Sequence, residues 1–312
     1  MESTYLLNNM LNRDLILEAA TETGIAPAFI EKDWYAVQLL KSLNEFENDR
    51  GVKLVFSGGT SLSKGFGLIK RFSEDLDFIL CSYEPISVGG RRSLRKSVIA
   101  HITSDPRFTI DDNAIQRGDS NRFFKAPVRY DMVFKQDFLR PYLQLEMTFS
   151  EHRLPLLKQD VRSIISELSC DEPETQITCV SPIETASDKI SALTWRVVVR
   201  DRNSEKDDPT MIRHLHDLAA LKDTIWRDKG LFIECAQQSL EDDQARRGGD
   251  VIAKMSISDR LLKAFEMLSS DELYREEYQQ FVQNMSYADE DDQILFDDAL
   301  LALKALIDIL VH

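Results

Sequence analysis

The sequence predicts an α+β fold in two parts, with strands and helices in residues 1–180 and helices alone in residues 181–312. Three observations support this prediction. Two segments near the start place apolar residues at helical spacing, several short runs between residues 53 and 149 alternate apolar with polar residues, and after Pro182 every periodic segment has helical spacing. We therefore expect a domain at 1–180 and a helical domain at 181–312.

The first two segments are predicted to be helices. The first covers Asn12–Thr23 and ends at Gly24, which can adopt the left-handed conformation that closes a helix. The second begins near Ala26 and carries an apolar stripe made of Ile30, Trp34, Val37, Leu40 and Leu43. The charged residues Glu31, Lys32 and Asp33 lie between these positions, so we expect them on solvated faces.

The next segment, residues 53–80, reads KLVFSGGTSLSKGFGLIKRFSEDLDFIL. It predicts a short strand at 54–56, a glycine turn, one helix at 60–69 and a second strand. Backbone N–H groups in such a turn can approach a phosphate closely. The candidate nucleotide-binding residues are Gly58, Gly59, Thr60, Ser61, Lys64 and Ser73.

The second strand of this segment carries Asp75 and Asp77. Side chains two positions apart on a strand point to the same face, so the two carboxylates are expected together. Like charges this close recruit a cation, and a hard divalent ion with oxygen ligands is the usual solution. A phosphate turn followed by a metal site indicates metal-dependent nucleotidyl transfer.

A basic helix is predicted at residues 87–104. Its exposed side is expected to hold Arg91, Arg92, Arg95 and Lys96, which stand out against a formal net charge of −15. This cluster is either a candidate RNA- or phosphate-binding surface or simply a solubilising face.

Further strands are predicted in residues 108–134 and at 142–150, where YLQLEMTFS alternates clearly. Glu146 lies in the middle of the polar face of the second of these. It is either a solvent-facing residue on an edge strand or, on a central strand beside Asp75 and Asp77, a third carboxylate for the same metal. Residues 151–178 read as a connector with one short helix or strand.

The remaining residues predict a series of helices, the first of which starts at Pro182. In the helix that begins near Thr210, Arg213 and Asp217 are four residues apart, which is typical of an ion pair within one helix. The last helix, at 293–311, has a broad apolar face that must pack on the core of this chain or on a partner.

The composition excludes several classes of protein. The four cysteines are scattered without a CxxC pair, so we expect free, buried thiols rather than a zinc site or disulfides. The sequence contains no apolar run of about 18 residues and does not begin with a signal-peptide pattern. We therefore expect a cytoplasmic protein with no membrane association.

The motifs GGTSLSKG and RFSEDLDF resemble the signature of the AbiEii/AbiGii-type nucleotidyltransferase toxins, a branch of the DNA polymerase β-like nucleotidyltransferase superfamily. The similarity extends to IEKDW, LQLEMTF, DKISALTWR and RHLHDLAAL, and thus to most of residues 28–222. It implies a mixed-sheet nucleotidyltransferase core with N-terminal helices and a C-terminal helical region. Such proteins are toxins of type IV-like toxin–antitoxin (abortive infection) systems, which implies an antitoxin protein as a partner.

The resemblance also implies roles for individual residues. Asp75, Asp77 and Glu146 would hold Mg²⁺ (or Mn²⁺), Lys189 would contact the phosphates of an NTP, and Asp217 would complete the pocket. Gly59 and Ser61 would lie at the phosphate turn. The acceptor is implied to be RNA, including tRNA. Ser73, two residues before the first aspartate, occupies the place where some relatives modify their own hydroxyl group.

Two other functions are compatible with the same residues. One is a nucleotide- or RNA-binding module without catalytic turnover, which the joint presence of three carboxylates and Lys189 disfavours. The other is a nucleotidyltransferase of antibiotics or other small molecules, which the basic cluster at Arg91–Lys96 disfavours.

Overall fold

The structure is a computed structural model that describes residues 11–246 and 251–311. The chain divides into two compact units. The sheet unit contains the chain up to Phe66 together with Phe72–His152 and Leu156–Cys179. The helical unit contains Gly67–Arg71, Arg153–Pro155 and the chain from Val180 onward. The division that we expected after residue 180 lies next to the change of unit at Cys179, but two short segments of the N-terminal half belong to the helical unit.

The predicted α+β fold is confirmed by a mixed seven-stranded sheet with the strand order β3-β4-β5-β2-β1-β7-β6. β2 pairs in parallel with β5, and β1 pairs in parallel with β7, whereas the other neighbours are antiparallel. The strands are β1 (Lys53–Ser57), β2 (Asp75–Cys81), β3 (Gln116–Gly118), β4 (Phe123–Val128), β5 (Leu143–Phe149), β6 (Leu157–Val161) and β7 (Thr175–Cys179).

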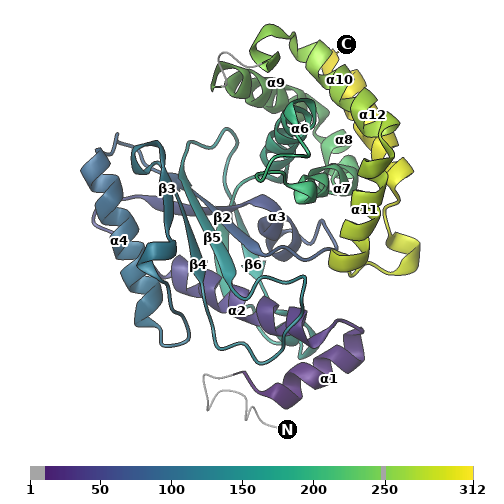
Figure 1. Ribbon diagram of the computed structural model, residues 1–312. Coiled ribbons are helices and arrows are strands. Elements are labelled where there is room, and N and C mark those ends of the chain that lie inside the picture. The colour runs from purple at the N-terminus through teal and green to yellow at the C-terminus, as the bar shows by residue number, and fades with distance from the viewer. Residues whose placement is uncertain (1–10, 247–250, 312) are drawn as a thin grey trace. The chain divides into compact units, whose positions relative to one another are not determined.

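Helices α1 (Arg13–Thr23), α2 (Pro27–Asn44), α4 (Val88–Ser104) and α5 (Ile164–Leu168) complete the sheet unit. As expected, α1 ends at Gly24, whose φ is 70°. α2 and α4 lie on one face of the sheet (Figure 1), where they bury the apolar residues of every second strand position, including Leu76, Phe78 and Leu80. The alternate positions of β2, among them Asp75 and Asp77, face the other side of the sheet.

The prediction that Glu31, Lys32 and Asp33 are solvated is wrong, because all three are buried within α2. Burial of a charge is tolerated when the charge is paired and hydrogen-bonded. The Glu31 carboxylate accepts hydrogen bonds from the backbone N–H groups of Val133 and Phe134. These two N–H groups are therefore not available to a strand ladder, and the strand expected to reach residue 134 ends at Val128.

The other two buried charges of α2 also bind distant segments. Lys32 forms an ion pair with Glu74, immediately before β2. Asp33 forms an ion pair with Lys64 (2.5 Å) and accepts a hydrogen bond from the N–H of Ile164. The charges of α2 thus tie together the segments that precede β2, follow β1 and begin α5.

Two further segments differ from the prediction. The helix expected at residues 60–69 is shorter and begins earlier, as α3 (Gly58–Thr60) followed directly by one π-helical turn (Ser61–Gly65). The expected connector at 151–178 contains β6, α5 and β7, which extend the sheet beyond β1.

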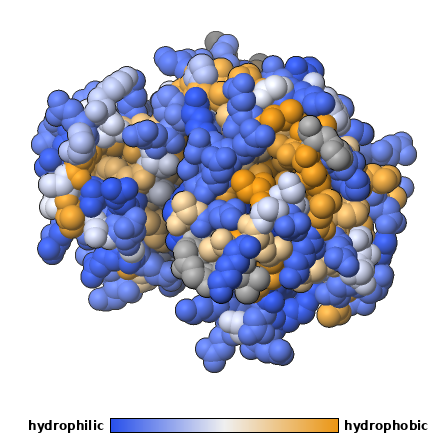
Figure 2. Space-filling view, turned by 90° about the horizontal axis from the view of Figure 1, so that it is seen from above, coloured by the Kyte–Doolittle hydropathy of each residue, from blue (hydrophilic) through white to orange (hydrophobic). Residues whose placement is uncertain are grey.

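The helical unit packs around α6, which contacts α7, α9 and α10 (Figure 1). Its helices are α6 (Pro182–Val199), α7 (Arg213–Ala220), α8 (Lys222–Arg227), α9 (Lys229–Arg246), α10 (Ile257–Ser270), α11 (Glu272–Met285) and α12 (Phe296–Val311). The apolar face of α12 packs on this chain, against α7, α9 and α10. Figure 2 shows a mainly hydrophilic face on which hydrophobic residues form several groups, the largest of them in the right half of the view.

No helix in the described ranges is long and apolar enough to cross a membrane. The four cysteines are free. Cys179 and Cys235 are buried as expected, whereas Cys81 is half-buried and Cys170 is exposed, because it lies in the turn after α5.

Candidate active site

The three predicted carboxylates lie on two adjacent central strands. Asp77 of β2 is paired in register with Glu146 of β5, and Asp75 stands two positions earlier on β2, opposite Gln144. All three side chains are half-buried. Because residues in register on neighbouring strands point to the same face, Asp75, Asp77 and Glu146 form a row of negative charge on the face not covered by α2 and α4. We call these three residues the carboxylate row.

Two cations neutralise this row. Arg140, in the loop before β5, pairs with Asp75 at 2.8 Å and with Glu74 at 3.3 Å. Lys125 of β4, in register with Glu146, forms an ion pair with it. Like charges on neighbouring strands repel one another, so these two side chains supply the positive charge that the row requires.

The glycine turn closes directly onto Asp77. Gly58 has a φ of 74°, a conformation that favours glycine. A Cβ atom at this position would stand only 2.0 Å from Asp77 Oδ2. Gly58 is therefore required both for the backbone conformation and for the close approach of the turn to the carboxylate.

The polar side chains of the turn brace it from within. The hydroxyl of Thr60 donates to the carbonyl of Asp75, and that of Ser61 donates to the carbonyl of Gly58. Lys64 points to Asp33 and donates to the carbonyl of Arg162 (3.4 Å). Ser57, which precedes α3, makes no capping bond with its side chain.

Ser73 lies two residues before Asp75, in the segment between Arg71 and β2, and is half-buried. Its neighbour Glu74 is held by Lys32 and Arg140, so the backbone on the β2 side of Ser73 is fixed by ion pairs.

The donor set fits a hard divalent cation, because Asp75, Asp77 and Glu146 offer carboxylate oxygens only. Within residues 11–246 and 251–311, no three acidic, histidine or cysteine side chains are close enough as they stand to hold an ion together. As they stand, the Asp75 carboxylate pairs with Arg140 and the Glu146 carboxylate pairs with Lys125.

Lys189 and Asp217, the other two predicted catalytic residues, belong to the helical unit. Lys189 of α6 lies 2.7 Å from Asp217 of α7, and Arg71 binds the same carboxylate through two hydrogen bonds of 2.6 Å. We call Arg71, Lys189 and Asp217 the buried triad, since all three are less than a tenth exposed.

The predicted pair between Arg213 and Asp217 within α7 is therefore wrong. Asp217 faces α6 and Arg71, whereas Arg213 binds Thr210 and lies 3.7 Å from Asp208. Burial alone would raise the pKa of Asp217, but Arg71 and Lys189 outweigh burial and hold that pKa well below its ordinary value. Asp217 is thus ionised at neutral pH.

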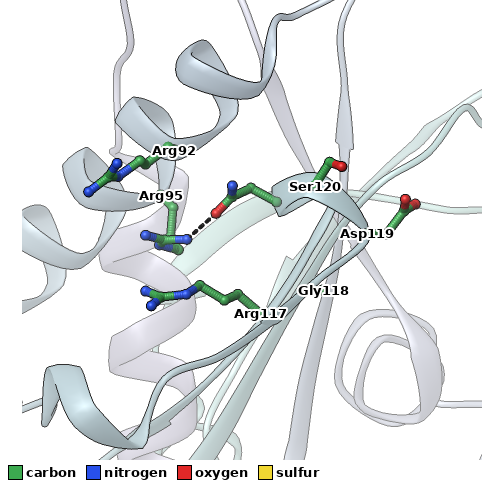
Figure 3. A pocket seen from close by; sticks show the side chains of 7 residues that line it. Arg92, Arg95, Arg117, Gly118, Asp119 and Ser120 are labelled. Atoms are coloured by element: carbon green, nitrogen blue, oxygen red, sulfur yellow. Dashed lines mark hydrogen bonds between the residues drawn. The ribbon is translucent and has the colours of Figure 1, made fainter.

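The basic cluster of α4 is only partly exposed as predicted. Arg92 and Lys96 are exposed, and Arg91 binds the carbonyls of Ile86 and Ser120. Arg95, expected on the exposed side, is buried, because it turns toward Asn121 and donates a hydrogen bond to its side-chain oxygen (Figure 3).

Sequence reasoning missed several residues that the structure brings to these sites. Arg71 and Glu74 lie within the RFSEDLDF motif, so the motif itself was a signal for them. Lys125 could be placed opposite Glu146 only once the register between β4 and β5 was known. Arg140 lies in a loop without periodicity, and no sequence signal identified it.

Comparisons with known proteins identify the family of the chain and a similar fold. A model of the family described as nucleotidyl transferase AbiEii toxin, type IV toxin–antitoxin system, matches residues 41–302. Among solved structures, the chain is similar to MenT4, a nucleotidyltransferase toxin from Mycobacterium tuberculosis, with 21% sequence identity and a TM-score of 0.53. That match covers 94% of this chain and 99% of MenT4. A search of curated proteins gives no match.

Proposed function

We propose an Mg²⁺-dependent transfer of a nucleotide from an NTP to RNA for this chain, which belongs to the family of AbiEii nucleotidyl transferase toxins of type IV toxin–antitoxin systems. The chain is accordingly a nucleotidyltransferase, and its family implies an NTP substrate and an antitoxin partner. One observation carries the proposal: the turn at Gly58 closes onto Asp77, which is paired in register with Glu146.

The carboxylate row would hold the metal. Nucleotidyltransferases of this kind generally use a divalent ion, and Mg²⁺ prefers the oxygen ligands that Asp75, Asp77 and Glu146 offer. Such an ion supplies positive charge at the reacting phosphate and at the pyrophosphate leaving group. Arg140 and Lys125, whose side chains are about one-third exposed, would release Asp75 and Glu146 to the ion without leaving a buried charge unpaired.

The turn would position the phosphates. The Ser57 side chain does not cap the helical turn that begins at Gly58, and backbone N–H groups at the start of such a turn bind anions. Thr60 and Ser61 use their hydroxyl hydrogens within the turn, so their proposed part is to fix its backbone beside Asp75 and Gly58. Lys64 would likewise fix the backbone of the turn, through its ion pair with Asp33.

The helical unit would contribute positive charge. In the buried triad, Arg71 and Lys189 both pair with the carboxylate of Asp217. We propose Lys189 as the group that contacts phosphate and Asp217 as the residue that orients it. Replacing Lys189 with Met should then raise the KM for the NTP.

The direct test uses each of the four NTPs, labelled at the α-phosphate, with total tRNA and either Mg²⁺ or Mn²⁺. Label should reach tRNA with the native protein and fall by at least about 100-fold with Asp77→Asn, the size typical for loss of a group that stabilises charge. Asp160→Asn, an exposed change on edge strand β6, is the matched control and should retain activity.

The products distinguish the alternatives. Label on a small molecule but not on tRNA would contradict the RNA acceptor, and NTP binding without pyrophosphate release under every condition would contradict the transfer. Label on the protein itself would point to Ser73, and its loss in Ser73→Ala, measured by intact mass, would identify that residue as the modified one.

A further inference from the structure

A pocket of about 400 Å³ lies at the edge of the sheet unit, away from the carboxylate row. It is lined by Arg92, Arg95, Arg117, Gly118, Asp119, Ser120 and Asn121, and we call it the arginine pocket. Its walls come from α4, from edge strand β3 and from the short 3₁₀ turn Asp119–Asn121.

Three guanidinium groups gather at this pocket. Figure 3 shows Arg95 and Arg117 next to each other, with Arg92 on the same side, whereas Asp119 and Ser120 point away from them. In the described part of the chain, none of the three arginines has a carboxylate within ion-pair distance. Burial and the neighbouring positive charges of Arg117 and Arg92 lower the pKa of Arg95, and Asp112 opposes them more weakly. Three unpaired like charges in a chain of net charge −15 favour an anionic ligand.

The backbone beside the pocket adopts an energetically unfavourable conformation. Asp119, Ser120 and Asn121 have φ values of 45°, 52° and 61°, three consecutive non-glycine residues in the left-handed region. Such residues persist only where the surroundings enforce them, and they are typical of ligand sites. Here the turn places the Asn121 oxygen on buried Arg95 and the Ser120 carbonyl on Arg91. The turn therefore fixes the orientation of Arg95 at the pocket.

The position of the pocket separates it from the reacting groups. Arg117 of β3 is in register with Phe124 of β4, which is in register with Met147 of β5. Met147 is in turn in register with Phe78 of β2, the residue after Asp77. Three strand spacings of about 4.8 Å place Arg117 about 14 Å from β2 along the sheet. Because Arg117 shares a row with buried Phe124 and Met147, it leaves β3 on the face opposite to the carboxylate row.

We propose that the arginine pocket binds a backbone phosphate of the RNA acceptor, at a site separate from the carboxylate row. This inference rests on the proposed RNA acceptor. Guanidinium groups bind phosphate oxygens in a planar, two-bonded geometry, which makes arginine the preferred residue for this contact. The exposed cations Lys96 and Arg122 beside the pocket extend the positive surface, which suits a polyanion better than an isolated phosphate.

The test measures binding of fluorescently labelled total tRNA by anisotropy, without NTP, over a range of salt concentrations. Arg117→Gln should weaken binding and reduce the slope of log K against log salt by about 0.7 to 0.9, the value for one lost phosphate contact. Lys158→Gln removes one positive charge from β6, at the other edge of the sheet, and should leave the slope unchanged. Arg92→Gln, on α4, should repeat the effect of Arg117→Gln.

Two results would overturn the inference. One is an equal effect of Arg117→Gln and Lys158→Gln on tRNA affinity and on its salt dependence, which would show that the pocket acts only as part of the general surface charge. The other is pyrophosphate binding that Arg117→Gln abolishes while tRNA binding is unchanged, which would indicate a small anion. Because no NTP is present, absence of transferase activity does not change these readouts, and the inference can fail while the transfer assay succeeds.

Discussion

The carboxylate row and the buried triad contain the same kinds of charged group but differ in their access to solvent. In the row, Asp75 and Glu146 keep about a fifth of their side chains exposed, and their partners Arg140 and Lys125 about a third. In the triad, Asp217 is completely buried and Arg71 nearly so. An exposed ion pair contributes little net stability, whereas a broken buried pair leaves an uncompensated charge.

This difference in solvent exposure suggests different roles for the charged groups of the row and of the triad. The metal ion that we propose for the row would replace these cations at small cost, as a site that changes partners during a reaction requires. The triad cannot exchange partners cheaply, which suits a fixed arrangement of charge. The following predictions test this comparison.

The largest expected effect is that of Asp217→Asn. It leaves Arg71 and Lys189 buried without their shared counter-ion, so the free energy of unfolding should fall by about 3 to 5 kcal/mol. Denaturant titration followed by circular dichroism measures this change. Asp292→Asn, which removes an exposed partner of Lys70, is the control and should leave the midpoint nearly unchanged. Equal midpoints for both variants would show that the triad is not a structural element.

The native protein and Asp217→Asn differ in their free energy of unfolding, and the lowered pKa of Asp217 predicts how this difference depends on pH. A carboxylate with a folded-state pKa below its unfolded-state value contributes stability above the unfolded-state value, and this contribution is lost as the pH falls through the folded-state pKa. The difference between the native protein and Asp217→Asn should therefore stay constant from pH 7 to about 4 and shrink only in stronger acid. A difference that shrinks between pH 7 and 5 would contradict this assignment.

A smaller effect is expected for Lys32→Met in the sheet unit. Its ion pair with Glu74 is mainly buried, but Glu74 keeps Arg140 as a second partner. We expect a loss of about 2 kcal/mol in stability, the size of a hydrogen bond to a charged group. Thermal unfolding of Lys32→Met beside Lys41→Met, an exposed position on the same helix, measures it. A loss as large as that of Asp217→Asn would show that Arg140, the second partner of Glu74, does not limit the effect of losing Lys32.

The sequence was sufficient to predict the elements with strong periodicity and the position of the carboxylate row. Alternation placed Asp75, Asp77 and Glu146 on polar faces, and the parallel pairing of β2 with β5 brings Glu146 beside Asp77. Several of the wrong predictions concern paired charges. Glu31, Lys32 and Asp33 have the spacing of a solvated flank, and only their distant partners at Val133, Glu74 and Lys64 make burial favourable.

Asp217 illustrates the same limit. A partner four residues away satisfies the local pattern, yet the structure joins Asp217 to Arg71, 146 residues earlier in the chain. Periodicity reports which face of an element is apolar, but it carries no information on which distant charge completes a buried pair.

A moderate effect is expected for Gly58→Ala. The left-handed conformation should cost about 1 to 2 kcal/mol of stability, and the added methyl group should displace Asp77 and reduce transfer strongly. Gly51→Ala is the matched control, since Gly51 has a φ of 63° but open space around it. It should lose similar stability while retaining transfer activity. Equal transfer activity in the two variants would contradict the requirement for close contact between the turn and Asp77.

The smallest expected effect is that of Lys125→Gln. Removing the cation that competes for Glu146 should strengthen Mn²⁺ binding by about two- to five-fold, the equivalent of one partly exposed ion pair. Isothermal titration calorimetry measures the affinity, with Lys158→Gln as the charge-matched control. An unchanged affinity would indicate that Glu146 does not bind the ion.

The pairing of Arg71 with Asp217 has a consequence for the synthesis of the protein. Segment Gly67–Arg71 belongs to the helical unit, yet it leaves the ribosome long before α7. At about 5 to 20 residues per second, the 146 residues between the two partners take about 7 to 30 s to translate. Until then the buried pair between Arg71 and Asp217 cannot form, so the helical unit of this toxin cannot reach its final packing while the nascent chain is shorter than about two-thirds of its length.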